Sequence, residues 1–224
     1  MGESSMNVIF DMDGVIFDTE RLYLECCRLA SGKLGVTGAE DVAYECIGLT
    51  DVETHKKLKN HFGDEATLEA FNKEIYRIFV EHYEKYGLTI KEGVVELLTF
   101  LKDRGARTAI GSSTETNIVE MELRDAGLLQ YFDVIVGGDM AKASKPAPDV
   151  FLLAAEKLQA DIKDCIIIED SFNGVRAARA SGATVFMVPD LLEPTDEIRG
   201  LTDQVYESLL EVKDYIKTFA CTDK

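Results

Sequence analysis

Two aspartates, Asp11 and Asp13, follow a short apolar run, Asn7–Phe10. Side chains two residues apart in an extended segment point to the same side, so both carboxylates can reach one centre. Hydrolysis of phosphate monoesters needs the largest known accelerations, about 10²¹-fold. An aspartate nucleophile divides that reaction through an aspartyl phosphate, and a second carboxyl group exchanges the protons. We assign Asp11 as nucleophile and Asp13 as acid/base, although two solvated acids in a turn would explain this pair alone.

A second acidic pair, Glu169–Asp170, follows the apolar run Cys165–Ile168, which suits a buried strand. Carboxylates within ~4 Å repel by roughly 4 kcal/mol per pair at an effective dielectric constant near 20. Mg²⁺ would relieve this repulsion, because it prefers oxygen ligands and often uses one or two carboxylates plus substrate phosphate. We expect the Asp11 and Asp170 carboxylates and the Asp13 carbonyl as ligands, with Glu169 behind them. A calcium loop is disfavoured, because its oxygen ligands would be closely spaced in one loop.

Two further segments carry groups that can hold a phosphoryl group. Ser112, with the backbone of Ser113, lies where an apolar run meets the start of a predicted helix, and helix amino termini bind anions. Considered alone, this serine is better explained as an ordinary helix cap. Lys145 precedes Pro146, which restricts the position of its ammonium group. A single lysine is usually a solvated surface residue, so the prediction of a phosphate clamp depends on agreement with the other segments.

Strand-like and helical patterns alternate after residue 93. We expect helices near 94–104, 148–158 and 173–181, another closed near residue 127, and strands at 107–111, 133–136, 165–168 and 184–188. Such alternation predicts an α/β protein with a doubly wound, Rossmann-like parallel sheet and right-handed crossovers. The motif segments adjoin strands, so they would meet at the carboxyl edge, where open α/β sheets bind ligands.

The segment from Glu20 to about Tyr86 has helical patterns and no convincing strand. We expect helices at 22–34, 52–62 and 68–83, with Thr50 and Glu53 as a capping box before the second. These patterns predict an all-helical domain at 18–87, inserted into an α/β core of 1–17 and 88–224. The paired linkers near 15–19 and 87–93 would act as a hinge.

Charge and composition limit the classes of partner. The chain has 24 Lys and Arg against 41 Asp and Glu, a net charge of −17, so we expect neither nucleic acid nor a membrane as partner. A negative surface repels phosphorylated substrates, so a phosphate site must depend on local positive charge and a metal. The chain start resembles no leader, no run is long enough to span a membrane, and five cysteines include no Cys-x-x-Cys pair. We expect a soluble cytoplasmic monomer with reduced thiols.

Taken in order, four segments resemble the haloacid dehalogenase superfamily: FDMDGVIFDTE, AIGSS, SKPAPDVF and IIIEDSFNGVRAARASG. The resemblance covers about residues 7 to 190. It points to the subgroup with a helical cap after the first strand, which holds phosphoglycolate and sugar-phosphate phosphatases and β-phosphoglucomutase. It implies the roles assigned above: Asp11 as nucleophile, Asp13 as acid/base, Ser112 and Lys145 on the phosphoryl group, and Asp170 on magnesium. Dehalogenases and phosphonate hydrolases lack a carboxylate at the position of Asp13, so neither matches.

The resemblance also implies that the cap segment 47–51 faces the cleft. β-Phosphoglucomutase has a phosphate-binding arginine where this chain has Asp51, a cap histidine where it has Tyr23, and a cap lysine to which Phe79 is nearest. We therefore expect a magnesium-dependent phosphatase of a small phosphorylated metabolite, a sugar phosphate being favoured, with the mutase as the alternative. Glu20 and Arg21 could contact the leaving group, although exposed helix positions explain them better.

A hypothesis of another class is an inactive relative that binds phosphate or a protein partner. The intact acids Asp11, Asp13 and Asp170 argue against it, because a chain that only binds has no need for a nucleophile and an acid/base. The sequence therefore predicts an enzyme.

Overall fold

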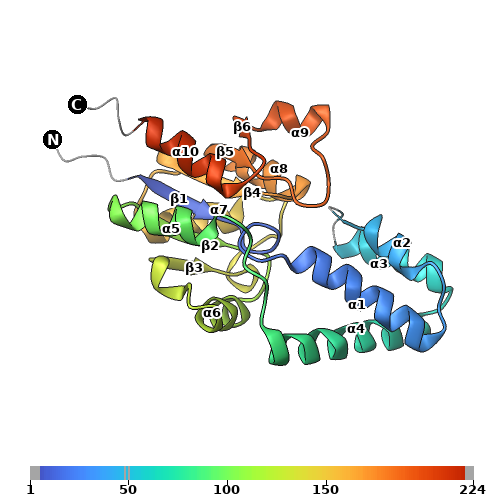
Figure 1. Cartoon of the computed structure of the whole chain (residues 1–224). Helices are drawn as coiled ribbons and strands as arrows, with labels where there is room; N and C mark the ends of the chain where they lie inside the picture. The colour runs from blue at the N-terminus through green and yellow to red at the C-terminus, as the bar shows by residue number, and fades with distance from the viewer. Residues whose placement is uncertain (1–5, 48, 50, 220–224) are drawn as a thin grey trace. The chain divides into compact units, whose positions relative to one another are not determined.

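Figure 1 shows the computed structural model of this chain, which describes residues 6–47, 49 and 51–219. The fold divides into two compact units: a core unit of Met1–Phe17 and Ile90–Lys224, and a helical unit of Asp18–Thr89. Each unit has apolar clusters of its own. Each can therefore be described by itself.

A six-stranded sheet forms the centre of the core unit, with all neighbouring strands parallel, in the order β3-β2-β1-β4-β5-β6. The strands are β1 (Asn7–Phe10), β2 (Arg107–Gly111), β3 (Val134–Val136), β4 (Cys165–Glu169), β5 (Thr184–Met187) and β6 (Gln204–Val205). Strand order reverses between β1 and β4, which is where sheets of this kind bind ligands. The predicted doubly wound parallel sheet is confirmed.

Helices cover the sheet. The core helices are α5 (Val94–Asp103), α6 (Thr116–Asp125), α7 (Asp149–Leu158), α8 (Phe172–Ser181), α9 (Asp196–Leu201) and α10 (Leu209–Phe219), and short 3-10 turns η1 (Leu129–Tyr131), η2 (Gly138–Met140) and η3 (Ile162–Asp164) join them. Helix α7 packs against β1, β2 and β3, and α8 packs against β4 and β5. Helices α5 and α10 pack together on the other side of the sheet (Figure 1).

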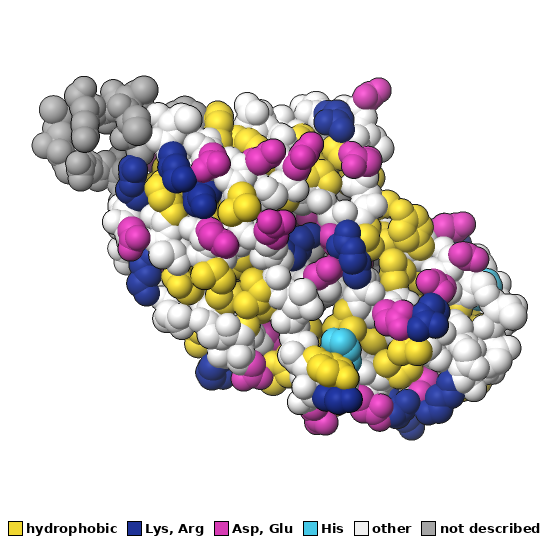
Figure 2. Space-filling view, in the orientation of Figure 1, with side chains coloured by type: hydrophobic (Ala, Val, Ile, Leu, Met, Phe, Trp, Pro, Cys, Tyr) yellow, Lys and Arg dark blue, Asp and Glu magenta, His cyan; other side chains and the backbone are white. Residues whose placement is uncertain are grey.

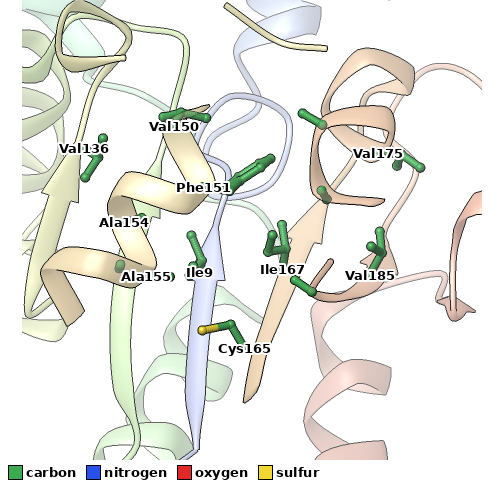
Figure 3. Packing of buried hydrophobic residues seen from close by; sticks show 14 of the residues in the cluster. Ile9, Val136, Val150, Phe151, Ala154, Ala155, Cys165, Ile167, Val175 and Val185 are labelled. Carbon is green, nitrogen blue, oxygen red and sulfur yellow. The ribbon is translucent and has the colours of Figure 1, made fainter. Parts of the chain in front are cut away.

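The packing of α7 on the sheet also shapes the site (Figure 3). Phe151 is fully buried over Ile9 of β1, in one cluster with Val136 and Ile167. A Cβ atom on Gly111 would lie 2.9 Å from Cδ1 of Phe151, so only glycine lets the ring pack this closely on β2. Burial of such a side chain contributes roughly 1.5–3 kcal/mol. The position of α7 relative to the sheet edge is therefore firmly fixed.

The helical unit is built from α1 (Thr19–Leu34), α2 (Ala39–Tyr44), α3 (Asp51–Phe62) and α4 (Glu65–Tyr86). Helix α1 packs against α2 and α4, and α3 packs against the same two helices. Asp64 caps α4, because its Oδ1 accepts a hydrogen bond of 2.9 Å from the Thr67 N–H. Two sequence predictions involve residues outside the described ones: the capping box at Thr50, and the segment 47–51, in which positions 48 and 50 and the side chain of Asp51 are not described.

Two linkers join the units at 17/18 and at 89/90. Phe17 and Ile90 form an antiparallel bridge, and the Lys91 N–H donates to the Ile16 carbonyl at 2.9 Å. Within the helical unit, the Asp18 N–H donates to the Thr89 carbonyl, also at 2.9 Å. The linkers are therefore hydrogen-bonded to each other rather than separate.

Figure 2 shows acidic and basic side chains interspersed over the face it presents. No helix in the described part of the chain is both long enough and apolar enough to cross a membrane. Cys26, Cys27, Cys46 and Cys165 are buried free thiols, and Cys221 lies outside the described residues. The expected cytoplasmic location and monomeric state stay predictions.

Candidate active site

The predicted site residues come to the carboxyl edge of the sheet because their strands are neighbours. Asp11 follows β1, and its N–H donates a 2.9 Å hydrogen bond to the carbonyl of Ile168 in β4. Glu169 ends β4 and Asp170 follows it. Ser112 follows β2, which pairs with β1 on the other side. The end of β1 is thus flanked by a serine on one side and an acidic pair on the other.

Lys145 connects two of these carboxylates. Its Nζ lies 2.5 Å from Oδ1 of Asp11 and 2.6 Å from Oε1 of Glu169. The lysine and aspartate side chains are only 7% and 9% exposed, and the glutamate side chain is fully buried. The Lys145 ammonium also lies 4.6 Å from the ring centroid of Phe151, the residue through which α7 packs on the sheet. Charges this deeply buried are tolerated only when paired, so Lys145 is not a solvated surface residue.

The buried ion pairs shift the protonation of their members. Burial raises the pKa of Asp11 to about 8; the Lys145 ammonium opposes this, and the charges of Glu169 and Asp13 add to it. Burial disfavours the charged form of Lys145, but its ion pairs with Asp11 and Glu169 outweigh that and hold its pKa above the usual range. A further cation against Asp11 would favour the carboxylate, which is the nucleophilic form.

Three carboxylates meet closely enough to hold a metal ion: ligand atoms of Asp11, Glu169 and Asp170 all lie within 4.8 Å of one another. The Glu169 oxygens already accept other hydrogen bonds. Oε1 accepts from Lys145 at 2.6 Å, and Oε2 accepts from the backbone N–H groups of Asp170 and Ser171, both at 2.9 Å. Both oxygens of Glu169 are thus engaged by groups of the protein itself. Which of the three carboxylates would bind the ion stays a prediction.

Gly14 gives Asp170 its space. Its φ is +77°, and a Cβ atom built there would lie 2.2 Å from Oδ2 of Asp170. Any larger residue would push the aspartate away from the loop that follows β1. Asp170 thus stays close to Asp11 and Glu169, and the three side chains offer carboxylate oxygens, the ligands that Mg²⁺ prefers. The residues present therefore fit this ion.

The two serines differ in their contacts. The Ser112 side chain is fully buried, and its Oγ accepts a 3.0 Å hydrogen bond from the Thr114 N–H. An oxygen that accepts in this way can still donate its own hydroxyl proton, as phosphate binding requires. Ser113 has its backbone against Gly138, where a Cβ atom would lie 2.2 Å from the Ser113 carbonyl oxygen. Ser112 lies at the same sheet edge as Asp11. Of the two predicted phosphate-binding side chains, that of Lys145 contacts Asp11 directly.

Asp13 makes a contact that the sequence did not predict. Oδ2 of Asp13 accepts a 2.8 Å hydrogen bond from the hydroxyl of Thr114. A second unpredicted group is Glu122 of α6, which is 6% exposed. Burial raises the pKa of its carboxyl group to about 7, and the charge of Asp13 adds to this. The sequence did contain a signal for this burial. Glu122 lies three residues after Val119 and one before Leu123, and these apolar residues have the spacing of a buried helix face.

Comparison with known proteins identifies the family. The model of the haloacid dehalogenase-like hydrolases matches residues 8–188, so the chain belongs to this family. A phosphorylated carbohydrates phosphatase of Thermotoga maritima is 36% identical over 177 residues, which are 78% of this chain and 81% of the relative. Fructose-1-phosphate phosphatase YqaB of Escherichia coli is 31% identical over 188 residues, 81% of this chain and 95% of that protein.

A solved structure supports the same conclusion. A Thermotoga maritima protein, provisionally described as a beta-phosphoglucomutase, has a TM-score of 0.79 and 30% identity, covering 95% of this chain and 99% of that one. The predicted resemblance to the haloacid dehalogenase superfamily is therefore confirmed, and the chain is an enzyme of the hydrolase class.

Proposed function

We propose that this chain is a magnesium-dependent phosphatase that hydrolyses a small phosphorylated metabolite of the sugar-phosphate class through an aspartyl phosphate on Asp11. The observation that carries the proposal is the buried contact of Lys145 with Asp11 at the sheet edge, beside Asp170. Relatives named as phosphatases of phosphorylated carbohydrates and of fructose 1-phosphate support the substrate class.

The charges at the site support the metal. When ionised, Asp11, Glu169 and Asp170 carry three negative charges, which the Lys145 ammonium only partly offsets, leaving a net charge of −2. One divalent cation balances that excess, with Asp11 and Asp170 as its carboxylate ligands and the Asp13 carbonyl as the expected third. When bound, magnesium would offset the negative charge of the transferring phosphoryl group.

In the first step, an Asp11 carboxylate oxygen bonds to phosphorus while the bond from phosphorus to the ester oxygen breaks. The Asp13 carboxyl group gives its proton to the departing oxygen, which leaves as an alcohol. Lys145 holds the nucleophile through its 2.5 Å contact with Asp11. The Ser112 hydroxyl donates to an oxygen of the phosphoryl group.

In the second step, water attacks phosphorus and the bond between Asp11 and phosphorus breaks. The Asp13 carboxylate, left ionised by the first step, accepts a proton from that water. Inorganic phosphate leaves, and Asp11 and Asp13 regain their starting protonation. No external oxidant or reductant is needed.

We assign the helical unit the role of a substrate-selecting cap, with the two hydrogen-bonded linkers as its hinge. The division at residues 17/18 and 89/90 and the separate apolar clusters of the helical unit support this assignment. Cap closure would exclude water other than the attacking molecule.

β-Phosphoglucomutase is the alternative, favoured by the provisional description of the similar Thermotoga maritima structure. Two cap residues argue against it. Tyr23 and Phe79, near the expected positions of a cap histidine and lysine, are partly buried against the apolar cluster of the helical unit. Neither carries a charge with which to hold a second phosphate group. A phosphatase therefore fits this cap better than a mutase does.

The test follows the fate of β-glucose 1-phosphate by phosphorus NMR, with magnesium and glucose 1,6-bisphosphate present. We expect inorganic phosphate as the main phosphorus product, and no conversion to isomerisation by the bisphosphate. Accumulation of glucose 6-phosphate well ahead of free phosphate would establish the mutase instead. Should this ester be refused, magnesium-dependent turnover of p-nitrophenyl phosphate must still be found, since its absence would favour the inactive binding relative.

A further inference from the structure

Thr114 lies between two residues of the proposed mechanism. Its hydroxyl donates to Oδ2 of Asp13 at 2.8 Å, and its backbone N–H donates to Oγ of Ser112 at 3.0 Å. One residue thus contacts both the proposed acid/base and the proposed phosphate-binding hydroxyl. These two groups act on opposite ends of the ester bond that breaks, so their separation matters to the reaction.

Thr114 is itself held by the backbone around it. Its carbonyl accepts a 2.9 Å hydrogen bond from the Gly138 N–H of η2. A Cβ atom on Gly137 would lie 2.7 Å from the same carbonyl oxygen, so this close approach requires glycine. Thr116, at the start of α6, donates both its N–H and its hydroxyl to Oδ1 of Asp139, each at 2.7 Å. The position of the Thr114 hydroxyl is therefore set by a supported loop.

The contact matches what an acid/base must do. A carboxylate accepts hydrogen bonds at its oxygens, so a hydroxyl that binds Oδ2 limits rotation of the group and fixes the direction in which it can exchange a proton. When Asp13 gives its proton to the leaving oxygen, it becomes negatively charged. The Thr114 hydroxyl then donates to an ionised acceptor, which makes the hydrogen bond stronger.

We propose that Thr114 is a positioning residue that holds the Asp13 carboxyl group at a fixed distance from Ser112 and so directs proton transfer to the leaving oxygen. This inference rests on the proposed phosphatase function. It predicts that the Thr114 hydroxyl matters most for substrates whose leaving oxygen needs a proton, and least for those whose leaving group is stable as an anion.

The experiment compares p-nitrophenyl phosphate, with a good leaving group, and phenyl phosphate, with a poor one, as substrates of the full chain with magnesium. Rapid-mixing measurements give the rate of phosphoenzyme formation for each. In Thr114→Val, we expect that rate to fall about 30-fold for phenyl phosphate but less than about 3-fold for p-nitrophenyl phosphate. Thr114→Ser restores the hydroxyl and should stay within about 3-fold of wild type for both.

Thr116→Val is the matched control: it keeps the Thr116 N–H that binds Asp139, and it removes a hydroxyl at the start of α6 that contacts Asp139 and the Gly137 N–H rather than Asp13. It should lower the melting temperature without changing the ratio of the two rates. If Thr114→Val does not fold by circular dichroism, Thr114→Ala removes the same hydroxyl and takes its place. Adding the Thr114 change to Asp13→Asn should have no further effect on phenyl phosphate.

Equal losses for both substrates in the Thr114 variant, or rates like those of wild type, would overturn the positioning role and leave the phosphatase proposal standing. A wild-type chain that turns over neither substrate would instead overturn the proposed function itself. The two failures are thus distinguished by the wild-type rates alone.

Discussion

At the scale of single residues, Lys145 shows how a charge can be buried at a reactive centre. Its ammonium has two carboxylate partners, so removing the charge from one partner leaves the other in place. Breaking a buried pair by removing its only partner costs about 3–5 kcal/mol, and the second carboxylate reduces that cost. The site should therefore tolerate neutral substitutions of Asp11 without loss of the fold.

The substitution Asp11→Asn uses this tolerance. We expect the variant to fold, because Lys145 keeps its 2.6 Å contact with Glu169. Turnover should fall at least about 10³-fold, since an amide cannot serve as the nucleophile. Steady-state assays with p-nitrophenyl phosphate and mass spectrometry of acid-quenched enzyme measure turnover and phosphoenzyme. Asp161→Asn, whose carboxylate caps η3 before β4 begins, is the control. A variant Asp11→Asn with near-normal turnover would refute the assigned nucleophile.

The sequence predicted some of these residues better than others. Asp11 directly follows an apolar run and Asp170 lies one residue beyond another such run, so strand pairing alone brings them to one edge. Thr114 and Glu122 were not predicted, because their contacts depend on how the loop before α6 turns and on which face of α6 is buried. The roles of all the site residues stay predictions.

At the scale of elements, strand β1 was predicted with the observed bounds, Asn7–Phe10, because a buried parallel strand is a short continuous apolar run. Helix α2 was missed, since its six residues are too few for a periodic pattern. No element was predicted after residue 190, although the buried Leu209, Val212 and Ile216 of α10 have helical spacing. Helix α2 was thus too short to be predicted from its pattern, whereas α10 had a predictable pattern that was overlooked.

The loop after β1 carries a prediction at this scale. In Gly14→Ala, the new Cβ atom would lie 2.2 Å from Oδ2 of Asp170, so the aspartate must move. The magnesium concentration for half-maximal activity should rise about 10-fold or more, as when a ligand's support is removed. The positive φ adds about 1–2 kcal/mol of destabilisation.

Gly105→Ala is the matched control for this change. Gly105 also has a positive φ, +66°, but a Cβ atom there would meet nothing within 4 Å. It should cost similar stability and leave the magnesium titration unchanged. An unaltered titration in Gly14→Ala would show that Asp170 does not hold the metal.

At the scale of the whole molecule, the protonation of one buried acid makes the stability of the fold depend on pH. Glu122 is buried in α6, and its pKa is raised from 4.5 to about 7, first by burial and then by Asp13. The folded chain therefore binds this proton more tightly than the unfolded chain does. The resulting stabilisation is fully present below the unfolded pKa, near 4.5, and is lost as the pH rises through about 7.

Glu122→Gln removes this titration. Between about pH 5.5 and about pH 8, the free energy of unfolding of wild type should fall by about 2 kcal/mol relative to the variant. Urea unfolding at both pH values measures the difference. Glu120→Gln changes a half-exposed acid on the same helix and should show no such trend. Parallel pH dependence in wild type and Glu122→Gln would mean that Glu122 is ionised throughout.

The two linkers have a consequence for how such a chain can change over evolutionary time. Because Phe17 and Ile90 form a bridge, the segment between them leaves the core unit and returns to it at neighbouring points. The ends of this segment are already held together, so replacing it with a segment of another length adds little loop-closure entropy. A doubling of loop length costs only about 0.6 kcal/mol. Residues 18–89 can thus be replaced or diverge as one unit, while the strands that carry the acids stay unaltered.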